Sequence, residues 1–360
     1  MVANKTPVAI LGATGMVGQR FVQLLDNHPW FEVVALSASE RSAGKRYADA
    51  ANWILETEMP AWARDMVLLE PEDAPPCRWV FSALPGGLAG PFEAQLAAAG
   101  HVVCSNASAH RMDPLVPLLI PEINADHLGL LPAQRRATGW EGALITAPNC
   151  TTTVLAMALA PLHRAFTVEA VHAVSMQGLS GAGYPGVSAL DIIDNILPHI
   201  NGEEEKLVAE PRKLLGALSG DAVVDAPFAV SAQCNRVPVR EGHFICANVR
   251  FARTPSVEDA IAALEAFEAP DVAALPSAPA KPIIVTRDPA RPQPRRDRDA
   301  DRGMAVTVGR VQPSATADLQ FVAIGHNTHR GAAAGALLNG ELLLTRAEAM
   351  LAELARAFSR

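Results

Sequence analysis

One cysteine stands where a helix is expected to begin. Cys150 follows Pro148 and Asn149 and precedes an apolar run over residues 154–160. Proline keeps the preceding backbone extended, asparagine is a favoured N-cap, and the apolar run is long enough for a buried helix. In the first helical turn, free backbone N–H groups and the helix dipole favour a thiolate, so we expect the pKa of Cys150 to be lowered. A packed core thiol is the alternative interpretation.

Two further stretches carry side chains that could act beside such a cysteine. Gln177 opens a loop with four glycines over residues 178–186, which could close over a ligand. Arg236 and His243 bracket a turn rich in proline and glycine between two expected strands. A histidine next to a glycine on such a loop is accessible enough to move protons.

Three charged residues are harder to interpret from their neighbours. Glu203 and Lys206 are three residues apart and face the same way if the segment is helical. Arg111 stands alone ahead of Met112-Asp113-Pro114. Solvated surface charges are the usual meaning of such residues, and their own sequence context predicts no more.

A glycine loop near the start of the chain indicates a nucleotide site. Residues 8–11 are expected to form a buried strand, residues 12–18 carry Gly12, Gly15 and Gly18, and a helix is expected over residues 19–26. Between a strand and a helix this spacing is typical of a dinucleotide site, because glycines let the backbone approach a pyrophosphate at the helix N-terminus. An ordinary strand-to-helix turn is the alternative.

The end of the second expected strand, over residues 31–36, favours NADP over NAD. Ser37 lies close to the position, about 20 residues beyond the glycine loop, where NAD-binding folds place an acid on the ribose. Ser37, Ser39 and Arg41 occupy this region instead, and the arginine would accept a 2′-phosphate. Glu40 argues against this interpretation, and a solvated loop is the alternative.

Repeated strand–helix units predict a parallel sheet of Rossmann type. Strands are expected over residues 79–84 and 101–107, with an alanine-rich helix over 92–99 between them. Because strand ends line the cofactor crevice in such sheets, Ser82 and Asn106 are predicted cofactor contacts. Later strands are expected over 168–175, 228–233, 244–251, 304–311 and 319–324, with helices over 190–198 and 327–344 and a surface loop over 291–302.

Composition narrows the class of protein. The chain has 360 residues and a net charge of −8, which favours two domains and argues against nucleic acid or an anionic membrane as the main partner. Its five cysteines are widely spread without CxxC spacing, so we expect no disulfide framework, no metal site and a cytoplasmic location. No targeting segment is visible, and no apolar stretch is long enough to span a bilayer.

With these pieces in place, the chain resembles the aspartate-β-semialdehyde dehydrogenases, specifically their archaeal and fungal branch. The resemblance runs nearly end to end and is carried by residues 12–18, Pro148-Asn149-Cys150, Gln177 with residues 180–186, residues 235–238 with Gly242-His243, residues 291–295 and residues 325–328. It implies an α/β fold with two domains: an NADP-binding Rossmann-type domain over residues 1–149 with a C-terminal helix over 327–360, and an α+β catalytic and dimerisation domain over 150–326.

The resemblance also implies roles for the residues above. Cys150 would attack the acyl phosphate of β-aspartyl phosphate and carry a thioester, His243 would be the general acid and base, and Gln177 would orient the acyl group. Bound NADPH would reduce the thioester to the aldehyde. The substrate would be held by Arg236 on its carboxylate, Glu203 on its ammonium group, Arg111 and Lys206 on its phosphate, and Asn149 beside the cysteine.

The predicted cofactor contacts gather at the glycine loop, the strand ends and the loop after Gln177. They are Gly12, Thr14, Gly15, Met16, Val17, Gly18, Ser37, Ser39, Arg41, Ser82, Leu84, Asn106, Ser180, Gly181 and Asn327. One departure from the family pattern is Thr151, where serine is usual, because its extra methyl group could crowd the acyl group. We expect small-molecule substrates and a homodimer or homotetramer.

Three alternatives remain at this stage. Malonyl-CoA reductase uses the same fold on a thioester, without need of phosphate or an amino group. N-acetyl-γ-glutamyl-phosphate reductase is a second relative, with weaker resemblance. A non-catalytic NADP-sensing or scaffold protein is the third, although Cys150, Gln177, Arg236 and His243 are all present.

Overall fold

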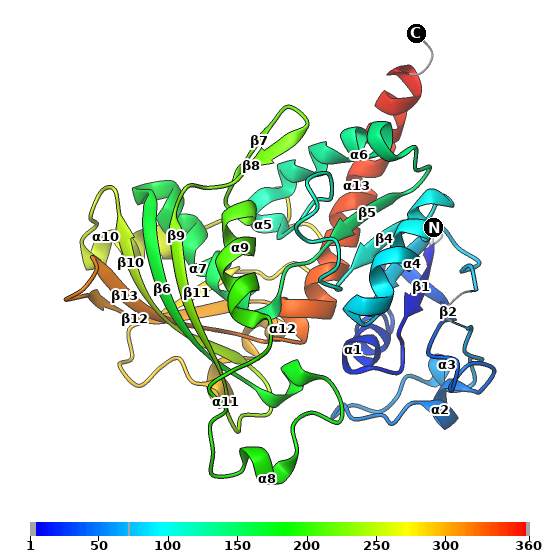
Figure 1. Ribbon diagram of the computed structural model, residues 1–360, viewed down its shortest axis with the longest axis horizontal. Coiled ribbons are helices and arrows are strands. Elements are labelled where there is room, and N and C mark those ends of the chain that lie inside the picture. The colour runs from blue at the N-terminus through cyan, green and yellow to red at the C-terminus, as the bar shows by residue number, and fades with distance from the viewer. Residues whose placement is uncertain (1–4, 71–72, 358–360) are drawn as a thin grey trace.

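The first half of the chain builds a parallel sheet. The computed structural model describes residues 5–70 and 73–357. Its first sheet has five strands in the order β2-β1-β3-β4-β5, all paired in parallel. The strands are β1 (Thr6–Leu11), β2 (Phe31–Leu36), β3 (Trp79–Ser82), β4 (Val102–Ser105) and β5 (Ala143–Thr146). The predicted Rossmann-type sheet is confirmed (Figure 1).

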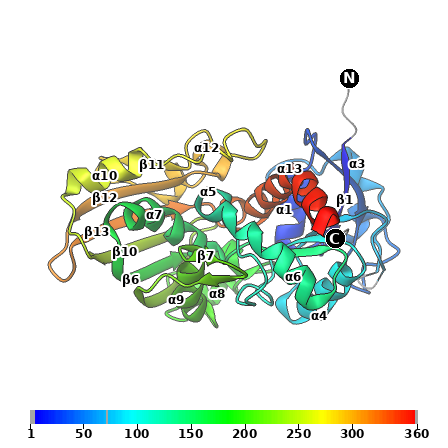
Figure 2. The ribbon, with the colours of Figure 1, turned by 90° about the horizontal axis from the view of Figure 1, so that it is seen from above.

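Helices cover both faces of this sheet. Helix α1 (Met16–Leu24) and helix α13 (Ala334–Ala357) share one apolar core with it, and α4 (Gly86–Ala98) packs on the other face. Figure 2 shows α1 and α13 lying side by side. Shorter helices connect the strands: α2 (Tyr47–Ala50), α3 (Ala61–Arg64), α5 (Pro121–Asn124), η1 (Ala125–Leu130) and α6 (Leu131–Thr138).

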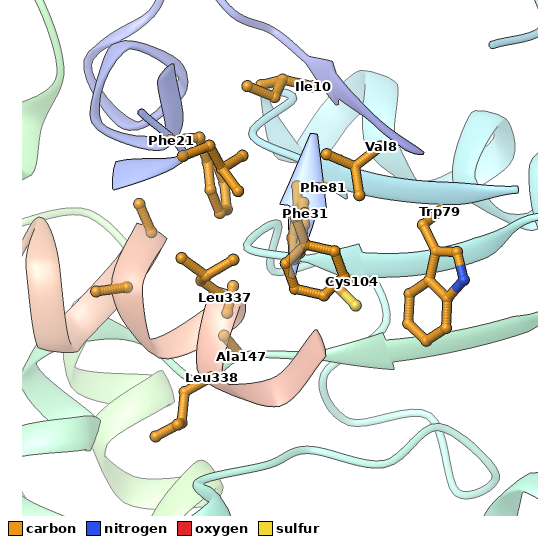
Figure 3. Close-up of a cluster of buried hydrophobic side chains, with 14 of the residues drawn as sticks. Val8, Ile10, Phe21, Phe31, Trp79, Phe81, Cys104, Ala147, Leu337 and Leu338 are labelled. Atoms are coloured by element: carbon orange, nitrogen blue, oxygen red, sulfur yellow. The ribbon is translucent and has the colours of Figure 1, made fainter. Parts of the chain in front are cut away.

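The C-terminal helix completes the core of the first sheet. Phe21 of α1 and Leu337 of α13 lie around Phe81 of β3 in one buried cluster (Figure 3). Gly340 allows this close approach, because a Cβ there would lie 2.9 Å from the Phe81 ring. The start of α13 thus packs on the first sheet. Neither α13 nor any other helix within the described ranges is long and apolar enough to cross a membrane.

The second half builds a mixed sheet of six strands in the order β11-β12-β13-β10-β6-β9. Helix α7 (Cys150–Phe166) is almost wholly buried and packs with α10 (Val257–Glu265) over one face, while α9 (Glu203–Leu214) lies against β9 and α7. The strands are β6 (Val168–Gln177), β9 (Ala229–Arg236), β10 (His243–Phe251), β11 (Ile283–Thr286), β12 (Val306–Pro313) and β13 (Leu319–Gly325), with a separate hairpin of β7 (Ala217–Ser219) and β8 (Ala222–Val224).

The helix predicted over residues 190–198 is wrong for most of its length. Only α8 (Ala189–Ile192) is helical. The backbone is already extended at Ile193, with a ψ of 130°, and Asp194 after it has a φ of 58°. Leu197 instead pairs with Arg236 through two backbone hydrogen bonds of 3.0 and 2.9 Å. The apolar spacing was misleading because Leu190 and Ile193 are exposed rather than buried.

Two other segments differ from expectation. The surface loop predicted over residues 291–302 contains α11 (Pro294–Asp297) and α12 (Ala300–Gly303), because Asp297 is buried and pairs with Arg291. The helix predicted from residue 327 begins as a π-helical turn, η3 (His329–Ala333), before α13. Helix α1 starts at Met16 rather than Gln19, so the end of the glycine loop is itself helical.

We propose the domain division stated above, at residues 150 and 327. The two sheets and their separate cores support it. Val272, Leu275 and Met304 pack into the core of the first sheet, so the second domain also lends side chains to the first. The outer ends of the predicted first domain, residues 1–4 and 358–360, lie outside the described residues.

Candidate active site

Cys150 occupies the first turn of α7, as predicted. The Asn149 side chain caps the helix, since its Oδ1 accepts hydrogen bonds from the Thr151 and Thr152 backbone N atoms at 2.9 and 3.2 Å. Gly331 of η3 packs directly on the cysteine, because a Cβ at that glycine would lie 2.7 Å from the Cys150 Cβ. Nothing in the residues around Cys150 indicates this contact, which joins it to a residue 181 positions away.

His243 lies against the cysteine. Its Nε2 is 3.1 Å from the Cys150 Sγ, and its ring is fully buried at the first residue of β10. Gly242 before it has a φ of 103°, a conformation that favours glycine. Gly181 lies over the ring, since a Cβ there would be 2.9 Å from the His243 Cε1. The structure thus brings the predicted nucleophile and the predicted proton carrier into contact.

The protonation of this pair differs from the expectation. Burial raises the pKa of the Cys150 thiol to about 12, and Glu203 adds to the rise. Burial and the nearby Arg236 lower the pKa of His243 to about 3. The predicted lowering of the cysteine pKa by the helix end is therefore wrong for this site, because desolvation outweighs it. At neutral pH the resting pair is a thiol beside a neutral imidazole.

Alkylation of the resting enzyme tests this protonation state. Because thiolate is the reactive form, the rate of Cys150 modification by iodoacetamide should rise steadily from pH 6 to pH 10 without a plateau. The rate is measured by mass spectrometry of the peptide that contains Cys150. A plateau below pH 8 would show a preformed thiolate and contradict the raised pKa.

Glu203 lies at the centre of the predicted substrate contacts. Asn149 Nδ2 donates to both of its carboxylate oxygens at 3.0 and 2.9 Å, and Lys206 Nζ donates to Oε1 at 2.8 Å. Gln177 Nε2 is 3.4 Å from Oε2. Burial would raise the pKa of Glu203, but the bonds from Lys206 and Asn149 lower it below its usual value. The site therefore presents a buried, ionised carboxylate.

Two arginines predicted to bind the substrate, Arg111 and Arg236, are buried near Cys150. Arg236 donates from Nη1 to the Gly178 carbonyl at 2.7 Å and is among the groups close enough to influence Cys150. Arg111 donates to the Asn106 carbonyl at 2.7 Å and forms a 3.0 Å ion pair with Glu210. Both guanidinium groups are thus held in fixed positions before any substrate binds.

Glu210 and Lys213 are site residues that sequence reasoning missed. Glu210 accepts from Arg111 and, at 2.7 Å, from the Asn149 backbone N. Lys213 donates to three backbone carbonyls of the segment that carries Arg111. The signal was available, because Glu210 and Lys213 follow Glu203 by seven and ten residues, on the same face of α9.

The glycine loop forms a cradle that side chains would fill. Gly12 has a φ of 70°, and a Cβ there would lie 2.7 Å from the Ala83 carbonyl oxygen. A Cβ at Gly18 would lie 2.1 Å from the Gly12 carbonyl oxygen. Thr14, Gly15, Met16 and Val17 complete the turn into α1. This close backbone at a helix N-terminus fits a pyrophosphate.

The strand ends beside the glycine loop also fit a dinucleotide. Among the described residues, Asn106 Nδ2 is buried without a hydrogen-bond partner, so it can bond a ligand. Ser82 Oγ is also buried there without a partner of good geometry, although it is close enough to lower the pKa of Glu93. A pocket of about 770 Å³ lies nearby and brings several predicted contacts together with an apolar wall. It is lined by Ser39, Glu40, Arg41, Leu84, Leu88, Pro91, Phe92 and Gln95.

Three predicted cofactor contacts already have partners within the protein. Ser37 Oγ donates to the Glu70 carbonyl at 3.3 Å. Asn327 donates to Ser180 Oγ at 2.8 Å and accepts from the Gly242 N at 2.8 Å. Their cofactor contacts stay predictions. Thr151 is buried and its hydroxyl has no partner within the described residues, and nothing in the structure explains its presence beside the cysteine.

The fold and the site together define a dinucleotide-dependent oxidoreductase with a cysteine nucleophile. Two family models match the chain: "Semialdehyde dehydrogenase, NAD binding domain" over residues 7–131 and "Semialdehyde dehydrogenase, dimerisation domain" over residues 159–330. The chain belongs to the aspartate-semialdehyde dehydrogenase family, as individual relatives also show, so the predicted resemblance is confirmed.

Its relatives include both branches named by the resemblance. The aspartate-semialdehyde dehydrogenase of Archaeoglobus fulgidus is 50% identical over 94% of this chain and 97% of its own. That of Schizosaccharomyces pombe is 44% identical over 94% of this chain and 98% of its own. The crystal structure of the Candida albicans enzyme with NADP matches with a TM-score of 0.87 at 41% identity, covering 94% of this chain and 98% of that one.

Proposed function

We propose that this chain reduces L-4-aspartyl phosphate with NADPH to L-aspartate 4-semialdehyde and phosphate, reversibly, on the pathway to lysine, threonine, methionine and isoleucine. The observation that carries the proposal is the 3.1 Å contact of Cys150 and His243, with Glu203 and Arg236 close by. Relatives at 41–50% identity bear the name aspartate-semialdehyde dehydrogenase, which supports the same reaction.

Acyl transfer starts from the neutral pair. In the structure His243 Nδ1 accepts a hydrogen bond from the Gly178 N at 3.2 Å. For Nε2 to act as the base, this bond must open and Nδ1 must instead donate to the Gly242 carbonyl, which has a second lone pair beside the one that the Gly178 N uses. With its proton on Nδ1, the ring turns the free lone pair of Nε2 toward Cys150. The thiol proton passes to Nε2 as the sulfur attacks the acyl carbon, the acyl–oxygen bond breaks, and phosphate leaves a thioester on Cys150.

Reduction and release follow on the same two residues. Bound NADPH supplies a hydride to the thioester carbon. The carbon–sulfur bond then breaks, the aldehyde leaves, and His243 returns its proton to the sulfur of Cys150. Gln177, whose amide lies beside Glu203, orients the acyl group.

Substrate recognition follows from the charges around Glu203. That carboxylate suits the α-ammonium group, and Arg236 suits the α-carboxylate in a bidentate fork. Arg111 and Lys206 would hold the phosphate. Lys206 is partly exposed and bonded to Glu203, so it can turn to a phosphate once the α-ammonium group of the substrate takes its place on that buried carboxylate. Asn149 keeps Glu203 aligned through both of its oxygens.

A direct spectrophotometric assay tests the proposed function. We expect phosphate-dependent reduction of NADP by aspartate semialdehyde, followed at 340 nm. Equal turnover without phosphate or arsenate would contradict the proposed reaction, in which phosphate is a substrate of the reverse direction. Activity with malonyl-CoA instead would support that reductase, an alternative that the similarity to named aspartate-semialdehyde dehydrogenases does not favour.

The choice of cofactor is tested in the same assay. Arg41 lines the pocket beside the glycine loop and would pair with the 2′-phosphate of NADP. Because hydrogen bonds to charged groups contribute about 1.5–3 kcal/mol, Arg41→Ala should raise the KM for NADP about 10- to 100-fold and leave the KM for NAD unchanged. An equal rise for both dinucleotides would contradict this role of Arg41.

We also propose that the chain forms a homodimer through the open face of the six-stranded sheet. The match to a dimerisation-domain family model supports this assembly. Phe244, Cys246, Val174 and Met176 are adjacent on that face and only partly buried, in contrast to the opposite face under α7. A sedimentation mass equal to the 38.0 kDa of one chain would contradict the dimer. A sedimentation mass of four chains would instead indicate a homotetramer formed by two such dimers.

A cytoplasmic location is a further proposal. All five cysteines are free thiols in the structure, and a reducing compartment would keep them so. Recovery of the protein in a secreted or periplasmic fraction would contradict it.

A further inference from the structure

Several residues from distant parts of the chain converge on Glu241, two positions before the proposed proton carrier. Arg20 Nη2 donates to its Oε1 at 2.8 Å, and His326 Nε2 is 3.3 Å from its Oε2. Arg298 Nη1 donates to its backbone carbonyl at 3.2 Å. Thr328 Oγ1, 3.4 Å from Oε1, completes the set.

Arg20 makes this cluster a link between the two domains. It lies on α1, the helix that begins at the glycine loop, and its side chain is 8% exposed. Glu241 belongs to the turn between β9 and β10 and is 13% exposed. Burial would raise the pKa of Glu241, but the hydrogen bond from His326 and the charges of His326 and Arg20 lower it to about 2. The link is therefore a largely buried pair of opposite charges at neutral pH.

The turn that carries Glu241 is held by hydrogen bonds at Gly242, the residue between Glu241 and His243. The Gly242 N donates to Asn327 Oδ1 at 2.8 Å, and the Gly242 carbonyl accepts from the Gly178 N at 3.1 Å. The same Gly178 N also donates to His243 Nδ1 at 3.2 Å. A shift of Glu241 would thus pass through one glycine to the histidine ring and to its contact with Cys150.

The cluster around Glu241 also includes two residues of the segment 291–302, a segment that has no role in the proposed reaction. Residues 291–302 contribute Arg298 to the Glu241 carbonyl and Asp299 to His326, at 3.6 Å. The Arg298 side chain also covers Gly242, since a Cβ at that glycine would lie 3.4 Å from the Arg298 Cβ. This segment therefore also supports the turn.

We propose that Arg20 and Glu241 are positioning residues, through which the cofactor-binding helix α1 fixes the His243 turn for catalysis. This inference rests on the proposed function for its kinetic test. Because α1 begins where the pyrophosphate would bind, the pair ties the cofactor site to the proton carrier. Neither residue touches the reacting atoms.

A set of substitutions with kinetic readouts tests the proposal. Arg20→Gln and Glu241→Gln should each lower kcat about tenfold and change the KM for aspartate semialdehyde less than about twofold, since only placement of the proton carrier is disturbed. The double variant should be no slower than Glu241→Gln alone, because both residues act through one link. It also leaves no unpaired buried charge, so it keeps the fold testable if a single variant unfolds.

Two comparisons separate positioning from general destabilisation. In a His243→Asn background, Arg20→Gln should have no further effect on the residual rate, whereas a purely structural defect would lower it again. Arg240→Gln is the matched control, because Arg240 reaches across from the same turn to Glu56 at 2.6 Å but is exposed. Its kcat should stay within twofold of the parent enzyme.

Opposite results would overturn the inference. They are an unchanged kcat in Arg20→Gln, recovery of the parent kcat in the double variant, an equal loss in Arg240→Gln, or an undiminished loss in the His243→Asn background. Iodoacetamide alkylation of Cys150 at pH 7.5 gives a readout that needs no substrate. Because displacement of His243 changes the surroundings of the thiol, the rate should differ severalfold between Arg20→Gln and the parent enzyme and should be unchanged in Arg240→Gln. A chain inactive on aspartate semialdehyde would refute the proposed function, while this alkylation result would still decide the positioning role.

Discussion

Cys150→Ser is expected to lower kcat for aspartate semialdehyde by at least about 10⁴-fold, because a serine hydroxyl beside a neutral histidine forms an ester in place of a thioester and is a poorer nucleophile and leaving group. The substitution leaves the packing on Gly331 in place, since the atoms of residue 150 nearest to that glycine are its Cβ, Cα and carbonyl oxygen, which serine keeps. The measurement is the rate of NADP reduction at saturating substrate.

Binding measurements serve as the control for this variant. Cys150 makes no contact with the glycine loop that would bind the pyrophosphate, so NADP affinity, followed by quenching of tryptophan fluorescence, should stay within a few fold of the parent. If the variant keeps more than about 1% of the parent activity, Cys150 is not the nucleophile of the reaction.

His243→Asn is expected to lower kcat about 10²- to 10⁴-fold at pH 7.5. The reason is the protonation state of the resting pair: with the pKa of the thiol raised to about 12, Cys150 needs a base to accept its proton during attack. Asparagine has about the size of the imidazole but cannot accept that proton. The rate of NADP reduction from pH 7 to pH 10 gives the test.

The pH dependence of the His243→Asn variant shows whether His243 acts as a base or only supports the structure of the site. Without the histidine, hydroxide must remove the proton, so the residual rate should rise about tenfold per pH unit. A residual rate that is flat with pH would show that the thiol ionises without His243 and would contradict its role as base.

The sequence predicted local features of the fold and site well. The N-cap Asn149, the glycine loop and the parallel strands are written in short stretches of residue types, and each is found where expected. The identity of Cys150 and His243 as partners came from the family resemblance, since nothing in their own surroundings shows that residues 93 positions apart meet.

What the sequence missed depends on burial and on distant contacts. The pKa of Cys150 rises because of desolvation, which no pattern of neighbours reveals. Residues 190–198 have helical apolar spacing, yet most of this segment is not helical, since α8 ends at Ile192 and Leu190 and Ile193 are exposed. Glu210 was overlooked because its partners, Arg111 and the Asn149 backbone, lie 99 and 61 residues away.

The closing of the first core by α13 has a consequence for biosynthesis. Leu337, Leu338 and Leu342 belong to the core of the first sheet, where α13 packs against β4, yet the ribosome makes them only after the whole second sheet. The nucleotide-binding half therefore begins synthesis first and completes its interior last, with Phe21 and Phe81 uncovered in the meantime. The N-terminal strands of the nascent chain must wait for its final helix, and this interval is when the chain is most exposed to aggregation and to chaperones.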